Sequence, residues 1–178
     1  MLLVSRVQAN AQSRYGIELE IGAQGALGSK VTYQKVNPGF GLFVEGRLNL
    51  PDTGFDVGLQ VSTSSVVRKD DTYSYDTKLY PMVLFVSDYN FKMSEVVTPF
   101  IGVGLGTSDC WYDYLETNGF SEKPYILSVD SFHFSACSRV GVEFFKHLRL
   151  SIDYTYTGNR LSNFVKFNLG IVFGGGRN

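Results

Sequence analysis

The chain has 178 residues, a length that fits one domain, and 44% of its residues are hydrophobic. Its formal net charge of −1 excludes the strongly basic surface by which most proteins bind nucleic acid. No run of about 18 apolar residues occurs, which excludes a membrane-spanning helix, whereas a spanning β-strand needs only about 9–11 residues.

The first residues resemble the end of an export signal. Ala9-Asn10-Ala11 has the small-x-small pattern of a signal-peptide cleavage site, although the apolar stretch before it is too short for a complete signal. We therefore expect residues 1–13 to be a signal-peptide remnant or a disordered N-terminus. Residues 14–174 then form one domain, and residues 175–178 form a short C-terminal tail.

Eight segments show alternation with a period of two, which predicts β-strands, because a helix requires spacings of three and four. In the second segment, for example, Phe40, Leu42 and Val44 alternate with Gly41 and Glu45. The segments at 77–91 and 98–108 are less regular than the others. The eight predicted strands are 15–22, 40–50, 55–62, 77–91, 98–108, 132–144, 148–156 and 165–173.

The connections between these segments alternate in length. Short turns are predicted at 51–54, 92–97 and 145–147, and longer or more polar loops at 24–36, 68–72, 109–125 and 158–162. An even number of strands with this alternation is typical of an outer-membrane barrel whose short turns face the periplasm. The sequence thus predicts an all-β, eight-stranded antiparallel up-and-down transmembrane barrel, and we expect it to be monomeric.

Two glycine-rich stretches resemble nucleotide-binding loops without matching them. Gly102, Gly104 and Gly106 have spacings of two, whereas the dinucleotide motif needs G-x-G-x-x-G before a helix. In the stretch 22–30, Ser29 separates Gly28 from Lys30, which breaks the phosphate-loop motif. We therefore predict that the three alternating glycines form one flat face of a strand, crowded by larger side chains from across the barrel.

The apolar face of the strands is expected to contact lipid. Eight strands enclose a space just wide enough for side chains, and so many large apolar residues would overfill it. The alternate face is rich in Gly, Ser, Asn and Gln and has few lysines, unlike a soluble surface. Aromatic residues also gather at both ends of the apolar face, as at the two membrane interfaces. The alternative is a soluble ligand-binding barrel with an apolar core.

Two sets of residues follow from this assignment. The predicted aromatic girdle consists of Tyr15, Phe55, Tyr89, Phe91, Phe144 and Phe173 near the short turns and Trp111, Phe132, Tyr154 and Tyr156 near the loops. The predicted lumen charge network consists of Glu18, Glu20, Glu45, Arg47, Asp56, Arg139, Glu143, Arg149, Asp153 and Lys166. Buried charges require partners, and the shortest turn over 145–147 places Arg139 opposite Asp153 and Glu143 opposite Arg149.

The chain resembles the small outer-membrane proteins that share an outer membrane protein beta-barrel domain, with an architecture like the transmembrane domain of outer-membrane protein A. The resemblance is carried by residues 98–108, 138–158 and 167–173. It implies an outer-membrane location, contact with lipid and lipopolysaccharide, and recognition by the barrel assembly machinery. Phe173 resembles the terminal aromatic residue of the assembly signal, although residues 174–178 follow it.

Enzymatic activity is not expected. Some barrels of this kind modify lipid A with a His-x-Ser pair and a carboxylate, and His133, Ser135 and Glu143 match those residue types. However, His133 and Ser135 share the lumen-facing parity, whereas a lipid reaches the outer wall. His147 is expected to face solvent.

No metal-ligand spacing or cofactor motif occurs, and no cofactor is predicted. Cys110 and Cys137 either pair or remain free. We expect a barrel with a plugged lumen and a structural or surface-interaction role, the extracellular partner being unidentified.

Overall fold

The computed structural model describes residues 16–28, 38–69, 75–91, 96–109, 111–114, 125–128, 133–158 and 163–174. Their strands are β1 (Gly16–Gly28), β2 (Gly39–Asn49), β3 (Phe55–Lys69), β4 (Tyr75–Asn90), β5 (Val97–Ser108), β6 (Trp111–Tyr114), β7 (Tyr125–Ser128), β8 (His133–Phe144), β9 (Leu148–Thr157) and β10 (Phe164–Gly174). Among these residues, no helix is long and apolar enough to cross a membrane.

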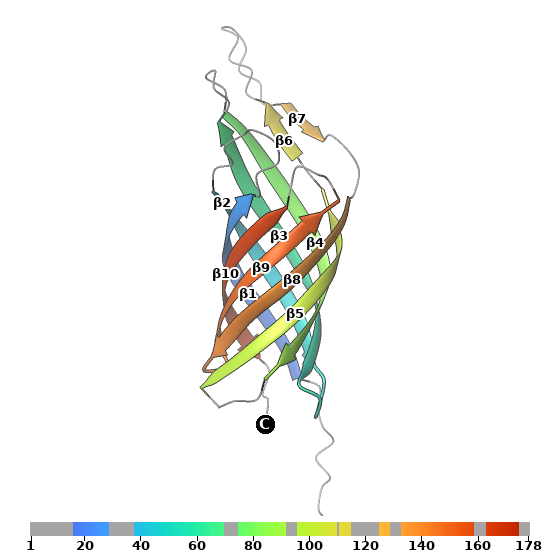
Figure 1. Cartoon of the computed structure of the whole chain (residues 1–178), viewed down its shortest axis with the longest axis vertical. Coiled ribbons are helices and arrows are strands. Elements are labelled where there is room, and N and C mark those ends of the chain that lie inside the picture. The colour runs from blue at the N-terminus through green and yellow to red at the C-terminus, as the bar shows by residue number, and fades with distance from the viewer. Residues whose placement is uncertain are drawn as a thin grey trace, which may run out of the picture.

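Eight of the described strands form a closed antiparallel barrel. Their order is β3-β2-β1-β10-β9-β8-β5-β4, and the pairing of β3 with β4 closes the sheet. Figure 1 shows the strands tilted around a common axis, with the short turns and the C-terminal end of the chain at the bottom. We call this the short-turn end and the opposite end the loop end. The predicted fold class is confirmed.

Two strands are longer than the alternation predicts. β1 continues to Gly28, so that residues 24–28, predicted as loop, pair with β10 and in part with β2. Residues 25–28 are glycine, alanine, leucine and glycine, which give little contrast between faces, so the sequence does not reveal the strand. β3 likewise continues to Lys69, into the predicted loop at 68–72.

The segment 109–125, predicted to be a loop, contains strand structure. β6 pairs with β4 at Thr77–Leu79, beyond the last pair of β4 with β5, and β7 then pairs with β6. The β6–β7 hairpin therefore extends one side of the wall past the rim of the barrel, as Figure 1 shows at the top. Strands of four residues are too short for their alternation to be recognised in sequence.

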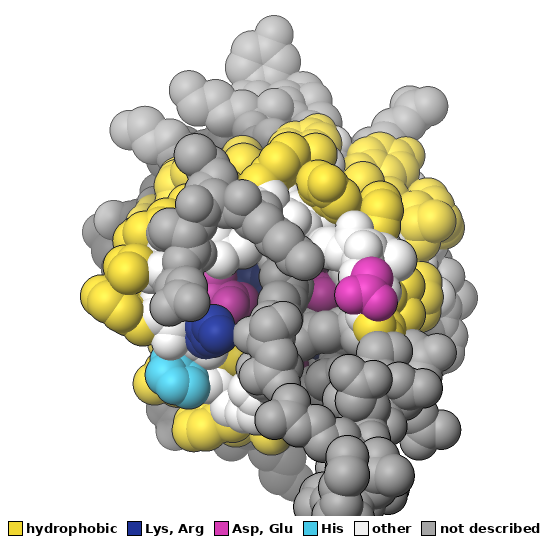
Figure 2. All heavy atoms as spheres, turned by 90° about the horizontal axis from the view of Figure 1, so that it is seen from below, with side chains coloured by type: hydrophobic (Ala, Val, Ile, Leu, Met, Phe, Trp, Pro, Cys, Tyr) yellow, Lys and Arg dark blue, Asp and Glu magenta, His cyan; other side chains and the backbone are white. Residues whose placement is uncertain are grey.

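The apolar face of the strands points outward. Along β9, Leu150, Ile152 and Tyr154 are 39%, 48% and 47% exposed, whereas Arg149 and Asp153, at alternate positions of the same strand, are 2% and 3% exposed. Figure 2, a view from the short-turn end, shows hydrophobic side chains around the outside and acidic and basic side chains within. This is the inverse of a soluble barrel, whose core is apolar and whose outer surface is polar.

The alternating glycines of β5 lie on the lumen face. A Cβ atom on Gly102 would contact the Asp88 carboxylate and lie 2.8 Å from the backbone oxygen of Ser87, and one on Gly104 would lie 2.7 Å from Cys137 Sγ. The expectation that side chains from across the barrel crowd these glycines is therefore wrong. The crowding at these two positions comes from the neighbouring strands β4 and β8, because Asp88 and Cys137 are the direct partners of the two glycines.

Replacing Gly102 by alanine should therefore destabilise the barrel by about 1–3 kcal/mol, as overpacking a filled interior does. Gly46 is the matched control, because a Cβ on this exposed glycine of β2 would meet nothing within 4 Å. Gly46→Ala should be neutral or stabilise by up to about 1 kcal/mol, since alanine loses less backbone entropy. Urea unfolding in phospholipid vesicles measures both, and equal effects would contradict the assignment of the two faces.

Candidate functional site

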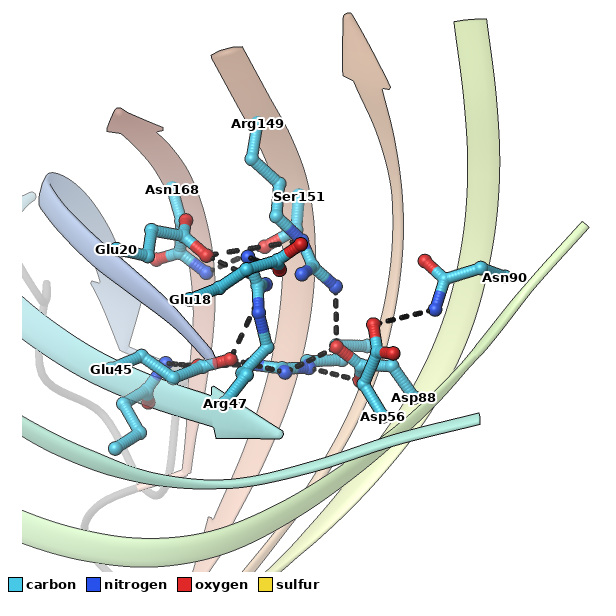
Figure 3. Close-up of polar contacts among 12 residues, drawn as sticks. Glu18, Glu20, Glu45, Arg47, Asp56, Asp88, Asn90, Arg149, Ser151 and Asn168 are labelled. Carbon is cyan, nitrogen blue, oxygen red and sulfur yellow. Dashed lines mark hydrogen bonds and ion pairs between the residues drawn. The ribbon is translucent and has the colours of Figure 1, made fainter. Parts of the chain in front are cut away.

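The most distinctive feature of the molecule is a buried layer of charged side chains in the lumen (Figure 3). All ten charged residues of the predicted lumen set lie on the inner face and are at most 7% exposed. They come from β1, β2, β3, β8, β9 and β10, because every second residue of each strand points inward.

Arg139 of β8 connects opposite parts of the wall. Its guanidinium donates from Nη1 to Glu45 Oε2 at 2.7 Å and from Nη2 to Glu45 Oε1 at 2.8 Å, which is a bidentate contact with β2. Its Nε also donates to Asp88 Oδ1 on β4, at 2.6 Å. Glu45 is 0% exposed and also accepts a hydrogen bond from Gln60 Nε2 at 2.9 Å. Charge-assisted, bidentate contacts of this kind are strong and fix geometry.

The other two arginines extend the layer. Arg47 forms ion pairs with Glu18 at 3.1 Å, Glu20 at 2.9 Å and Glu45 at 3.5 Å. Arg149 forms an ion pair with Asp88, lies 3.9 Å from Glu20 Oε2, and stacks with its guanidinium carbon 3.6 Å from the centre of the Phe100 ring. Three arginines and their carboxylates thus form one connected network across the lumen.

Asp88 is the residue that the predicted lumen set lacks. It is 1% exposed and forms ion pairs with both Arg139 and Arg149, so it links these two arginines. Its strand was one of the two less regular ones in sequence. Tyr89, however, is predicted to lie on the outer wall, and alternation from Tyr89 places Asp88 inside.

The predicted hairpin register is confirmed, but its charge pairs describe the network only in part. Arg139 is opposite Asp153 and Glu143 is opposite Arg149 in the β8–β9 ladder. The guanidinium of Arg139 nevertheless extends to Glu45 and Asp88 on distant strands, while Asp153 Oδ1 accepts a hydrogen bond from Ser151 Oγ at 2.8 Å. A long arginine in a narrow lumen reaches carboxylates that strand pairing does not place beside it.

The lumen nearer the loop end contains two apolar clusters beside its polar side chains. Met82, Leu84, Val86 and Cys137 form one buried cluster, and Ala26, Tyr80 and Phe164 form another. Lys166, which is 2% exposed, lies among these groups with its Nζ 3.6 Å from Met82 Sδ. Cys137 is a free, buried thiol. Cys110 lies outside the described residues.

The predicted girdle residues that the structure describes lie on the outer wall. Phe55, Tyr89 and Phe91 form a ladder near the short turns, with ring centroids 4.9 and 5.0 Å apart. Tyr154, Tyr156 and Phe173 are 46–52% exposed, and Phe144 is half-buried. Tyr15, Phe132 and the side chain of Trp111 lie outside the described parts of the chain.

The residues weighed as catalytic candidates do not form an accessible site. Ser135 is 0% exposed on the lumen face, and its Oγ donates a hydrogen bond to Ser108 Oγ at 2.7 Å. His133 pairs with Ser108 in the β5–β8 ladder, at the loop end of β8. His147 is exposed in the β8–β9 turn, with its Nδ1 3.3 Å from the backbone oxygen of Val172. Within the described ranges, no three His, Cys, Asp or Glu residues are placed to hold a metal ion.

Comparisons with known proteins agree with this architecture. Solved structures with the same fold include Ail of Yersinia pestis in complex with the heparin analogue sucrose octasulfate (TM-score 0.53, 14% identity, 89% of this chain and 99% of Ail). Neisserial surface protein A is similar (TM-score 0.53, 12% identity, 90% and 96%), as is Ail in a phospholipid bilayer nanodisc (TM-score 0.51, 12%, 90% and 99%). No curated protein matches the sequence. The family model described as outer membrane protein beta-barrel domain matches residues 1–174, and the chain therefore belongs to this family of outer-membrane proteins.

Proposed function

We propose that this outer-membrane barrel is closed to solutes and that it acts structurally or by binding at its extracellular end, without catalysis. The observation that carries the proposal is the cross-lumen contact of Arg139 with Glu45 and Asp88, because it joins β8 to β2 and β4 through side chains that are at most 7% exposed. An eight-stranded barrel has an interior that side chains can fill.

The extracellular end supports a role in surface interaction. Long loops of such barrels face the outside, and the β6–β7 hairpin together with the upper parts of β3 and β4 extends beyond the closed wall at that end. The proposed binding segments are 24–36, 109–125 and 158–162, with residues 24–28 now assigned to β1. The proposed partners in the membrane are lipid, lipopolysaccharide and the assembly machinery, which would read the outward-facing Phe173 of β10.

The alternative of lipid A modification needs a nucleophile on the outer wall. Ser135 instead faces the lumen and is fully buried, which supports a role without catalysis. Mass spectra of lipid A from cells with and without the protein test this point. A mass change that depends on the protein, and that Ser135→Ala abolishes, would contradict the proposal.

The closed lumen predicts that the purified barrel produces no stable conductance in planar bilayers at physiological salt. The physical reason is that the ion pairs of Arg47, Arg139 and Arg149 bridge an eight-stranded lumen whose width side chains can fill, which would leave no open path for ions. Folding of the same sample is checked by heat-modifiable migration on a gel. Reproducible conductance steps of porin size from a folded sample would refute the proposal.

A further inference from the structure

We propose that Phe145, in the turn between β8 and β9, inserts into the interface of the periplasmic leaflet and anchors this end of the barrel to the membrane. The turn is closed by a hydrogen bond from His147 N to the Phe144 backbone oxygen, at 3.0 Å. Its two central residues, Phe145 and Lys146, have φ angles of 53° and 61°. The proposal rests on membership of the outer-membrane family and not on the closed lumen or the role of the loops.

The backbone of this turn does not suit the residues that occupy it. Tight hairpin turns with positive φ at both central positions favour Asn-Gly, Asp-Gly or Gly-Gly, because a Cβ atom is crowded in that conformation. A bulky phenylalanine there is an outlier that the surrounding structure must hold in place. Such strain at a non-glycine residue is a reason to ask what its side chain does.

The side chain of Phe145 lies largely outside the protein. It is 66% exposed, and the Phe145 N–H is held by the Val96 backbone oxygen at 2.9 Å, which ties the turn to the β4–β5 connection. Leaving about two thirds of a phenylalanine in water is unfavourable unless another apolar medium covers it.

The membrane interface is the apolar medium at this position. Phe145 directly follows Phe144, a predicted member of the girdle at the short-turn end. Other exposed apolar residues at the same end are Phe91 at 40%, Val96 at 48% and Phe173 at 52%. The apolar outer face of the barrel therefore continues as far as this turn. The exposed residues Lys146 and His147 follow Phe145 directly and suit the headgroup layer.

Depth-dependent fluorescence quenching tests the insertion directly. In a Trp111→Phe background, which leaves no other tryptophan, Phe145→Trp is refolded into phosphatidylcholine vesicles with bromine on the acyl chains close to the headgroup. We expect blue-shifted emission and at least twofold quenching relative to unbrominated vesicles. Thr53→Trp, in the Pro51–Thr53 turn between β2 and β3, is the control and should remain unquenched. A water-like, unquenched emission from position 145 would overturn the proposal and leave this residue as a contact for a periplasmic protein.

A second measurement applies if the tryptophan variants do not fold. Phe145→Gly and Asp52→Gly each relieve a non-glycine residue of positive φ, 53° and 61°, in a turn at the short-turn end, so their difference reports the Phe145 side chain. In vesicles, urea titration should give a folded-to-unfolded ratio about tenfold lower for Phe145→Gly than for Asp52→Gly, which is the size expected for loss of a partly buried phenylalanine. An equal or higher ratio for Phe145→Gly would overturn the proposal.

Discussion

Replacing Arg139 by methionine is expected to lower the free energy of unfolding by about 3–5 kcal/mol. Methionine keeps much of the side-chain volume but removes every charge-assisted contact that Arg139 makes with Glu45 and Asp88. Glu45 is 0% exposed and Asp88 is 1% exposed, so bulk water cannot replace the contacts that either carboxylate loses, and each keeps only its other arginine partner, Arg47 or Arg149. Urea unfolding of the barrel in phospholipid vesicles measures the loss.

A double-mutant cycle identifies which contact carries this energy. Arg139 and Glu45 should couple strongly, because the bidentate contact is removed by either Arg139→Met or Glu45→Gln. The matched cycle pairs Arg139→Met with Asp153→Asn, which is its direct partner in the β8–β9 ladder. The coupling to Asp153 should be the smaller of the two. The reverse order would mean that strand pairing, and not the contact across the lumen, determines the partner.

This contrast also marks how far the sequence could predict the site. Alternation with a period of two places Arg139 and Asp153 on the inner face, and the three-residue turn fixes their register, because both are local properties of a hairpin. The position of a guanidinium at the end of a flexible side chain is not local. It depends on which carboxylates the closure of the barrel brings opposite to it, and Glu45 is 94 residues away along the chain.

Asp88 illustrates a second limit. Inward-facing residues of its strand include Tyr80, Met82, Leu84 and Val86, which are as apolar as the outward-facing residues, so the strand lacks a clear contrast between faces. Reading backwards from the aromatic end of the strand, at Tyr89 and Phe91, would have placed Asp88 and Asn90 inside. In the structure both side chains are buried, at 1% and 2% exposure.

The loop end was the least predictable part of the fold. β6 and β7 have four residues each, and β6 joins the sheet only because β4 extends beyond its last pair with β5. Such pairing depends on the length of a neighbouring strand, which is not encoded in the segment itself. The end of β1 also depends on a neighbouring strand. Its last residues, 25–28, pair with residues 164–167 of β10.

Replacing Ile152 by arginine is expected to destabilise the barrel in vesicles by about 2–4 kcal/mol, which is the cost of placing an arginine on the lipid face near the bilayer midplane. Ile152 lies in the middle of the outward-facing residues of β9, between Val140 of β8 and Phe167 of β10. It is 48% exposed, so the added side chain meets no steric barrier from the protein.

Leu148→Arg is the matched control for Ile152→Arg, because Leu148 lies on the same face of the same strand, is 39% exposed, and is next to the short turn over residues 145–147. The cost of arginine falls to about 0–1 kcal/mol near the interface, where the guanidinium reaches the headgroups. If water covered the outer wall, both substitutions would be surface changes of about 0.5 kcal/mol or less. A difference between the two positions therefore requires a hydrocarbon layer around the barrel, and equal, small effects would favour the soluble barrel that the alternation alone left open.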